Sequence, residues 1–349
     1  MTKIAVVLFN LGGPDSLEAV RPFLFNLFND PAIIGAPTPV RWALAQFISR
    51  RRAPVAREIY EKLGGRSPLL PHTQDQARAL EAALAGEGVE ARAFIAMRYW
   101  HPFTADVVAE VKRFGPDRIV LLPLYPQYSR TTSGSSIRHW HHHAAAAGLD
   151  APTTTVCCYP TEPGFVRAQA ALVAAELDAL EAERGDHPPP RVLFSAHGLP
   201  KKVIAGGDPY QWQVEQSAAA VAAALDRPGL DWRVTYQSRV GPLEWIGPAT
   251  DSEIEAAGRE GRPLVVVPIA FVSEHSETLV ELDMEYGELA HQSGVPLYRR
   301  VSTVLSAPAF IDGLAGLVRR AVATSGTGPV SERGGRLCPG TCGQCPTTA

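Results

Sequence analysis

Residues 191–200 read RVLFSAHGLP, and residues 264–279 read LVVVPIAFVSEHSETL. Each stretch begins with an aliphatic, β-branched run that is typical of a strand buried on both faces of a parallel sheet. Each then continues into a polar turn, which carries His197 in the first stretch and His275 and Glu277 in the second. Ligand sites in open α/β sheets collect beyond the carboxyl ends of the strands. We therefore expect these three side chains to lie at one rim of a sheet.

The same alternation of strand-like runs and Ala-rich helical stretches extends along the whole chain, which predicts βαβ units and an α/β fold with parallel sheets flanked by helices. The runs that predict strands are 4–9, 91–96, 118–124, 154–158, 191–195, 232–237, 264–270 and 296–300. The stretches that predict helices are 74–85, 105–114, 164–184, 212–224 and 278–290.

A faint internal repeat indicates two similar halves. VLFNLGGP at 7–14 resembles VLFSAHGLP at 192–200, and IVLLPLYPQYS at 119–129 resembles LVVVPIAFVS at 264–273. The paired segments lie about 40 residues further apart in the first half, where the apolar stretch 25–68 is the candidate insertion. With the Pro-rich break GDHPPP at 185–190 as boundary, we expect two Rossmann-like domains at 1–185 and 186–325, and a Cys-rich tail at 326–349.

The bulk properties limit the function classes. The chain has 349 residues and a net charge of −3, which argues against a nucleic-acid-binding surface. No apolar run approaches the roughly 18 residues of a spanning helix, and we interpret the apolar N-terminus as the first strand. We therefore expect a cytoplasmic protein, a monomer or homodimer. The apolar stretch 25–68 could be core, or it could form a lip that rests on the inner membrane surface.

Carboxylates recur at Glu277, Glu281 and Glu285. Residues four apart share one face of a helix, so these side chains form an acidic stripe. A solvated acidic face is one interpretation. Because the stripe begins directly after a buried strand, we favour a path that conducts protons or leads a hard cation inward.

Five cysteines in a cytosolic chain do not indicate a disulfide framework. Three lie in CPGTCGQC at Cys338, Cys342 and Cys345, and the other two are adjacent at Cys157 and Cys158. Three thiolates are too few for a closed tetrahedral metal site. A fourth ligand from the adjacent pair would suit zinc or a [2Fe–2S] cluster, and the spacing alone does not choose between them.

These motifs together resemble the ferrochelatases, class II chelatases that insert ferrous iron into a porphyrin. The resemblance extends over most of the chain and includes LFNLGGPDS, RRRAP, EIYEKLGGRSPL, AMRYWHP, LYPQYSRTTSGSS, FSAHGLP, YQSRVGPLEWIGP, PIAFVSEHSETL and LVELDMEY. It implies two chelatase-type domains and a lyase that inserts Fe²⁺ into protoporphyrin IX to form protohaem, the last step of haem biosynthesis.

The resemblance also implies roles for individual residues. His197 and Glu277 would face the macrocycle centre and bind the substrate Fe²⁺, with His275 beside them and Glu281 on the acidic path. Leu11 and Trp245 would pack against the ring. The residues implied along the pocket that holds propionates and ring edges are Arg52, Tyr60, Ser67 and Ser238. Those implied on the opposite, metal-entry side are Arg98 and Tyr125.

One departure from the family concerns the cluster that some ferrochelatases carry. Their first cluster cysteine directly follows the YPQYS motif, where this chain has Arg130, and the tail spacing also differs. The resemblance therefore implies a [2Fe–2S] cluster on the three tail cysteines and either Cys158 or Cys157. Adjacent residues of a strand face opposite sides, so we expect only one of the pair to be a ligand and favour Cys158.

Other functions fit parts of the pattern. A coproporphyrin ferrochelatase is the nearest alternative, although the long apolar lip favours protoporphyrin, which has fewer carboxylates. A chelatase that inserts another metal, such as cobalt, into another tetrapyrrole is a second. A haem or porphyrin carrier without catalysis is a third, and it would need the lip and the arginines but not the acidic stripe.

Overall fold

The computed structural model describes residues 2–86, 88–239, 241–324 and 326–347. Contacts divide the chain into two compact units. The first unit comprises Met1–Cys158, Leu314–Arg336 and Pro346–Ala349, and the second comprises Tyr159–Gly313 and Leu337–Cys345. Each unit contains one sheet whose strand pairs are parallel, which confirms the predicted fold class.

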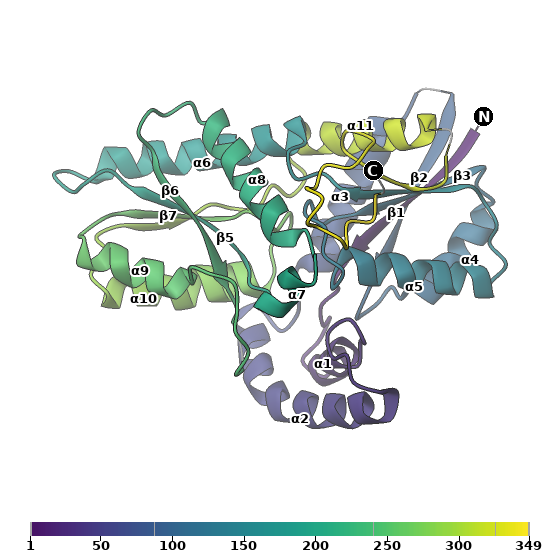
Figure 1. Cartoon of the computed structure of the whole chain (residues 1–349), viewed down its shortest axis with the longest axis horizontal. Coiled ribbons are helices and arrows are strands. Elements are labelled where there is room, and N and C mark those ends of the chain that lie inside the picture. Colours follow the sequence, from purple (N-terminus) through teal and green to yellow (C-terminus); the bar gives the residue numbers. More distant parts are fainter. Residues whose placement is uncertain (1, 87, 240, 325, 348–349) are drawn as a thin grey trace. The chain divides into compact units, whose positions relative to one another are not determined.

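The sheet of the first unit has the order β2-β1-β3-β4-β9. Its strands are β1 (Thr2–Asn10), β2 (Val89–Met97), β3 (Arg118–Pro123), β4 (Thr153–Cys158) and β9 (Pro329–Ser331). One face is covered by α4 (Thr104–Phe114) and α5 (Ser133–Ala146), and the other by α3 (Leu69–Leu84) and α11 (Pro308–Ala323) (Figure 1). Apolar side chains of β1, β2 and β3 pack against α4 and α5 to form a buried core.

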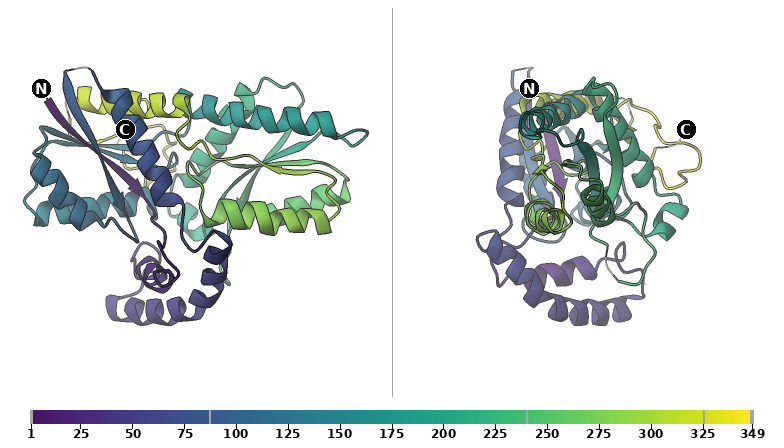
Figure 2. Two further views of the ribbon diagram at one scale, coloured as in Figure 1. Left: turned by 180° about the vertical axis from the view of Figure 1, so that it is seen from behind. Right: turned by 90° about the vertical axis from the view of Figure 1, so that its left-hand side faces the viewer.

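Two further helices occupy the predicted insertion. They are α1 (Val20–Phe28) and α2 (Thr38–Lys62), which pack against each other and project away from the sheet of the first unit (Figure 2). Their shared core includes Val20, Phe23, Leu24, Ala53 and Tyr60. α2 also exposes large apolar side chains, namely Val40, Trp42, Leu44, Phe47 and Val55.

The sheet of the second unit has the order β6-β5-β7-β8. Its strands are β5 (Arg191–His197), β6 (Asp231–Gln237), β7 (Leu264–Pro268) and β8 (Tyr298–Arg300). One face is covered by α6 (Pro163–Glu183) and α8 (Tyr210–Ala224), and the other by α9 (Thr250–Arg259) and α10 (Tyr286–Gln292) (Figure 1). The short helix α7 (Lys201–Ala205) follows β5. A π-helix, η1 (Glu277–Glu285), precedes α10.

The predicted repeat is confirmed by the topology. In the first unit β1 lies between β2 and β3, and in the second unit β5 lies between β6 and β7. The matched motifs therefore occupy equivalent strands, with β1 corresponding to β5 and β3 to β7. The extra length of the first half corresponds to α1 and α2.

All eight predicted strands form, and three features differ from the sequence-based expectation. Residues 329–331, placed in the tail, instead add β9 to the edge of the first sheet beside β4. The helix predicted at 278–290 begins as a π-helix. The chain divides after Cys158 rather than at 185, because α6 packs against α8 within the second unit and Ser217 Oγ donates a 2.7 Å hydrogen bond to the Pro160 carbonyl.

Candidate active site

The carboxyl rim of the second sheet brings His197 and Glu277 into direct contact. His197 is the last residue of β5 and Glu277 the first of η1, and His197 Nδ1 lies 2.9 Å from Glu277 Oε2. The turn after His197 needs a glycine, because a Cβ on Gly198 would lie 3.0 Å from the Gln237 carbonyl to which the Gly198 amide is bonded. The absence of a side chain at 198 thus lets the turn after His197 lie close against the end of β6.

The two groups perturb each other's ionisation. Burial alone would raise the pKa of Glu277, but the charge of His197 and its hydrogen bond outweigh that effect and hold the pKa at about 2. Burial alone would lower the pKa of His197, but the charge of Glu277 and the same hydrogen bond raise it above 6.5. The side chains remain 39% and 27% exposed respectively, so solvent or a ligand can reach the pair.

His275 lies next to this pair. Its Nε2 is 4.0 Å from Glu277 Oε2, too far for a hydrogen bond, and its Nδ1 donates to the Ser273 carbonyl at 3.2 Å. Burial lowers the pKa of His275, although the charge of Glu277 opposes that effect. A neutral His275 with Nδ1 protonated has its lone pair on Nε2, on the side of Glu277.

Glu281 is held by residues at the end of the neighbouring strand β6. Ser238 donates its backbone N–H to Glu281 Oε1 at 2.8 Å and its hydroxyl to Oε2 at 2.5 Å, and Gln237 Nε2 donates to Oε2 at 3.1 Å. Ser238 has a φ of +60°, a left-handed conformation that costs a non-glycine residue energy. Burial and the nearby charge of Glu277 raise the pKa of Glu281 above 4.5. Glu281 therefore binds a proton more readily than Glu277 does.

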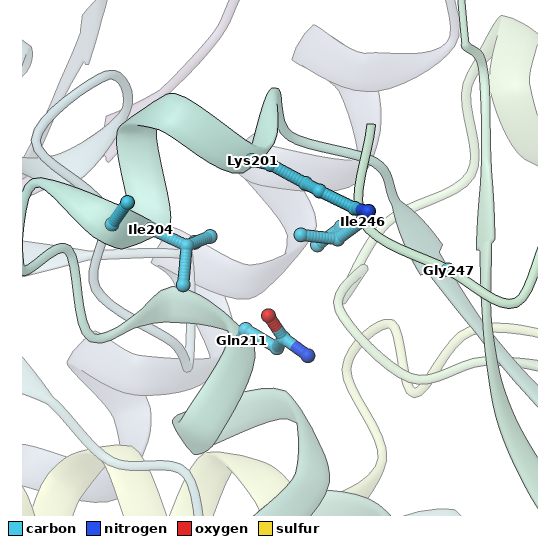
Figure 3. A pocket seen from close by; sticks show the side chains of 6 residues that line it. Lys201, Ile204, Gln211, Ile246 and Gly247 are labelled. Carbon is cyan, nitrogen blue, oxygen red and sulfur yellow. The ribbon is translucent and has the colours of Figure 1, made fainter. Parts of the chain in front are cut away.

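A shallow pocket opens beside this rim in the second unit. Lys201 and Ile204 of α7, Gln211 of α8, and Ile246 and Gly247 of the loop after β6 line it (Figure 3). The Trp245 ring, in the same loop, packs against Gly198. A Cβ added to Gly198 would lie 3.3 Å from Trp245 Cε3. The loop that carries Trp245 is thus in contact with the turn that follows His197.

The first unit carries a separate charged cluster at the end of its own sheet. Arg98, the residue after β2, pairs with Asp30 at 2.8 Å and donates from Nε to Ser135 Oγ at 2.8 Å. Asp30 Oδ2 also accepts from Ser135 Oγ at 2.6 Å and from Tyr99 Oη at 2.7 Å, and Oδ1 accepts from the Ala32 amide. Burial would raise the pKa of Asp30, but the Ser135 hydrogen bond and the charge of Arg98 lower it overall.

Several buried hydroxyl groups of the residues before and within α5 have no partner in the part of the chain that the structure describes. Tyr125 Oη, Ser133 Oγ and Ser136 Oγ are buried and have no hydrogen-bond partner among the residues that the structure describes. Burial raises the pKa of Tyr125 and lowers that of His139, on the same helix α5, to about 4. Buried polar atoms of this kind are normally paired.

The remaining predicted substrate residues all lie in the first unit. Leu11 is half-buried against the apolar core of α1 and α2, to which Tyr60 belongs. Ser67 is buried, and its amide donates to the Pro14 carbonyl at 2.8 Å. Arg52 is exposed on α2, with its guanidinium 5.9 Å from the centre of the Phe28 ring.

Sequence reasoning missed several residues of these two clusters. Asp30 and Ser135 complete the Arg98 cluster, although they lie 105 residues apart in the chain. Gln237 was seen only as the end of a strand, and Arg300, which contacts the acids on either side of Glu277, was not singled out. No local pattern could have found Asp30, because its partners are set by tertiary packing.

The cysteines correct one expectation. Cys157 and Cys158 do not face opposite sides, because a register shift between Val156 and Cys158 breaks the regular alternation of β4, and their sulfur atoms lie 3.1 Å apart. The prediction that strand alternation selects one of them was therefore wrong. The structure describes all five cysteines, and none forms a disulfide.

The three tail cysteines belong to the second unit. Cys338 and Cys342 are buried and Cys345 is partly exposed, and Cys338 Sγ accepts a 3.1 Å hydrogen bond from Gln213 Nε2. The Gln344 amide donates to the Gly207 carbonyl, which holds the tail against the turn between α7 and α8. Thiolates suit iron–sulfur clusters and zinc. Within the described ranges, however, no group of three or more His, Cys, Asp or Glu side chains is arranged to hold a metal ion.

Comparison with known proteins gives consistent matches over nearly the full length. The family model "Ferrochelatase" matches residues 3–322. A ferrochelatase of Caulobacter vibrioides is 56% identical over 346 residues, covering 99% of this chain and 97% of the relative. Ferrochelatases of Phenylobacterium zucineum and Pelagibacter ubique are 55% and 49% identical, over 98% and 90% of this chain and 97% and 90% of the relatives.

A solved structure supports the fold independently. The sirohydrochlorin chelatase SirB from Bacillus subtilis subspecies spizizenii, in complex with cobalt, aligns with a TM-score of 0.54. The alignment covers 93% of this chain and 97% of SirB at 12% identity. At that identity the similarity concerns the fold alone.

Proposed function

Because this chain belongs to the ferrochelatase family, and is therefore a metal-chelating lyase, we propose that it inserts Fe²⁺ into protoporphyrin IX to form protohaem. The observation that carries the chemical part of the proposal is the 2.9 Å contact between His197 and Glu277. Insertion must remove two protons from pyrrole nitrogens, and this pair supplies an accessible proton acceptor.

The contact defines which nitrogen of His197 can act as the base. With a pKa of about 2, Glu277 is ionised at neutral pH and can only accept a hydrogen bond. His197 Nδ1 must therefore donate, so in the neutral imidazole the lone pair is on Nε2. We propose that Nε2 takes the pyrrole protons, while Glu277 orients the ring and stabilises the imidazolium that forms.

Protons must then leave His197 for the next turnover. Glu281, whose pKa is raised, is a better proton acceptor than Glu277, and Glu285 is exposed one turn further along η1. We propose that these two carboxylates pass protons toward solvent. The same oxygen and imidazole donors, His197 and Glu277 with His275 beside them, would also contact the entering Fe²⁺.

Substrate-binding roles follow the family resemblance. Arg52, Tyr60, Ser67 and Ser238 would hold propionates and ring edges, Leu11 and Trp245 would pack on the ring, and Arg98 and Tyr125 would line the metal-entry side. A rigid pocket that holds the macrocycle bent would expose the nitrogen lone pairs, which a planar ring keeps in its plane.

We further propose a [2Fe–2S] cluster on Cys338, Cys342, Cys345 and either Cys158 or Cys157. The donors fit such a cluster in kind, since all are thiols and four of the five are buried. We propose that the cluster has a structural role and ties the tail to the body of the protein. An absorbance spectrum of freshly purified protein should show visible bands that Cys338→Ser abolishes, and a colourless protein with bound zinc would contradict the cluster.

The location of the protein is also a proposal. No helix in the described ranges is long and apolar enough to cross a membrane. The exposed apolar side chains of α2, with Phe47 and Val55 each 62% exposed, support a peripheral contact with the inner membrane for a cytoplasmic enzyme.

The deciding experiment is steady-state metal insertion under anaerobic conditions. Fe²⁺ should be inserted into protoporphyrin IX with a higher kcat/KM than into coproporphyrin, and faster than Co²⁺ or Zn²⁺ under matched conditions. A preference for coproporphyrin would favour the neighbouring enzyme class. Tight porphyrin binding without any insertion would favour a carrier and would reject the proposal.

A further inference from the structure

Arg300 makes a double ion pair around the candidate active site. It ends the edge strand β8, and its side chain is only 9% exposed. Nε and Nη2 donate to the two carboxylate oxygens of Asp283 at 2.8 and 2.7 Å, and Nη1 donates to Glu274 Oε1 at 2.7 Å. One planar guanidinium thus binds one carboxylate through two parallel bonds and a second carboxylate through a third.

The two carboxylates flank the predicted catalytic groups. Glu274 directly precedes His275, and Asp283 follows Glu281 by two residues. The stretch 274–283 therefore carries three of the four candidate catalytic side chains, and Arg300 holds both of its ends. A shift at either end would move Glu277 relative to His197, which belongs to a different strand.

This stretch depends on outside support because most of it is a π-helix, a conformation that is rare and usually short. Tyr298 lies two residues before Arg300, so both side chains leave β8 on the same face. Tyr298 Oη donates to the Leu282 carbonyl at 2.6 Å, and the Thr303 amide donates to Glu274 Oε1 at 2.9 Å. The edge strand and the residues after it thus form a template for η1.

We propose that Arg300 is a positioning residue that sets the placement of Glu277 and His275 against His197. It touches neither of these groups, and it acts through Glu274 and Asp283. The inference rests on the proposed iron insertion and adds to it the element that keeps the base and its carboxylate in contact. Lysine carries the same charge but cannot make the fork, so Arg300→Lys separates geometry from charge.

The preceding residue provides a matched control. Arg299 also lies on β8 and also binds two carboxylates, Glu176 at 3.2 Å and Glu183 at 2.6 Å. Both belong to α6, on the other side of the strand and away from η1. Arg299→Lys therefore removes a similar double ion pair from the same strand without touching the segment that carries Glu277.

The test compares Arg300→Lys with Arg299→Lys in the full-length protein. For Arg300→Lys we expect kcat for iron insertion to fall about ten- to a hundredfold, with the porphyrin KM within about twofold of wild type. We also expect the acid limb of the kcat/KM profile to move to lower pH, because His197 loses the neighbouring charge that keeps its pKa raised. Arg299→Lys should leave kcat and the porphyrin KM within about twofold of wild type, and it should leave the acid limb of the kcat/KM profile in place.

A purely structural ion pair would give a different result. Arg300→Lys would then lower the melting temperature while kcat per folded molecule and the acid limb matched those of Arg299→Lys, and this outcome overturns the proposal. If Arg300→Lys does not fold, Asp283→Asn is the second variant, because the Asp283 side chain is 37% exposed. This substitution disrupts the two parallel bonds between Arg300 and Asp283, leaves the bond to Glu274 intact, and should show the same loss of kcat.

The two proposals fail in distinguishable ways. If the wild-type protein inserts no iron, the proposed function is rejected. The positioning role of Arg300 can still be tested by NMR titration of the His197 imidazole, because that measurement needs no substrate. A lower pKa of His197 in Arg300→Lys than in Arg299→Lys supports the positioning role, and equal values reject it.

Discussion

The four strands of the second sheet match the order of β2, β1, β3 and β4 in the first, but the carboxyl rims of the two sheets carry different chemistry. β5 ends on His197, whereas the equivalent β1 ends on Asn10. After β6 comes Ser238, which binds the titratable Glu281, whereas after the equivalent β2 comes Arg98, whose charge is permanent. The shared topology supplies equivalent positions, and the residue types at those positions decide what each rim can do.

The two carboxylates at these rims show the difference most clearly. Asp30 is 2% exposed at its side chain and accepts from Arg98, Ser135, Tyr99 and the Ala32 amide, so it is ionised and saturated. Glu277 is 27% exposed and binds His197, an imidazole whose pKa it raises and which can gain or lose a proton. The first cluster is suited to hold a structure in place, and the second to move protons.

The largest effect should follow removal of the titratable base. His197→Ala should lower the rate of iron insertion about a thousandfold, since a positioned general base contributes roughly 10²–10⁴. Porphyrin affinity, measured by fluorescence quenching, should stay within about threefold of wild type. His291→Ala, at an exposed histidine of α10, is the control, and normal turnover of His197→Ala would remove this residue as the base.

Glu277→Gln keeps the size of the side chain and removes its charge. The pKa of His197 is raised by Glu277, so this variant should shift the acid limb of kcat/KM to lower pH. The maximal rate should fall about ten- to a hundredfold as the imidazolium loses its partner. Glu288→Gln, on the exposed side of α10, should leave the profile in place. An unmoved limb in Glu277→Gln would show that the two groups do not interact in solution.

Asp30→Asn should act on stability instead. Breaking a buried ion pair leaves Arg98 without its counter-charge and should cost about 3 kcal/mol of unfolding free energy at pH 7. The pKa of Asp30 in the folded protein is lowered below its ordinary value of 3.8. The stabilisation by the ionised carboxylate is therefore fully present above pH 3.8 and is lost as the pH falls from there through the lower pKa of the folded state. The difference in unfolding free energy between wild type and Asp30→Asn, measured by urea denaturation, should therefore become smaller as the pH falls below 3.8.

The exposed ion pair of Arg78 and Asp75 on α3 is the comparison for that variant. Asp75→Asn should cost no more than about 0.5 kcal/mol. Equal costs for the two substitutions would contradict the view that the Asp30 cluster supports the first unit.

The smallest effect is expected at Arg52 on α2. Because its guanidinium is exposed, Arg52→Ala should leave the unfolding free energy within about 0.5 kcal/mol. Loss of a charged contact to a propionate should raise the porphyrin KM about tenfold. Arg113→Ala, at an exposed position of α4, should leave KM unchanged, and an equal KM in both variants would argue against a role for Arg52 in binding the substrate.

The amino-acid sequence determined which segments form strands and which strands end in reactive side chains. Apolar runs such as 191–195 and 264–268 indicate buried parallel strands, and the polar residues that follow them must emerge at the carboxyl rim. For that reason the meeting of His197 and Glu277, 80 residues apart in the chain, could be anticipated without coordinates. Composition and residue order suffice for inferences of this kind, because strand direction and side-chain alternation are local properties.

Only the tertiary structure decided the supports of those side chains. The π-helix, the Arg300 fork, the cluster around Asp30 and the close sulfurs of Cys157 and Cys158 all depend on contacts between distant segments or on a register shift in the sheet. Such contacts produce no periodic pattern of residues in the sequence. They are set by strand register and by the packing of one element on another, which exist only once the chain has folded.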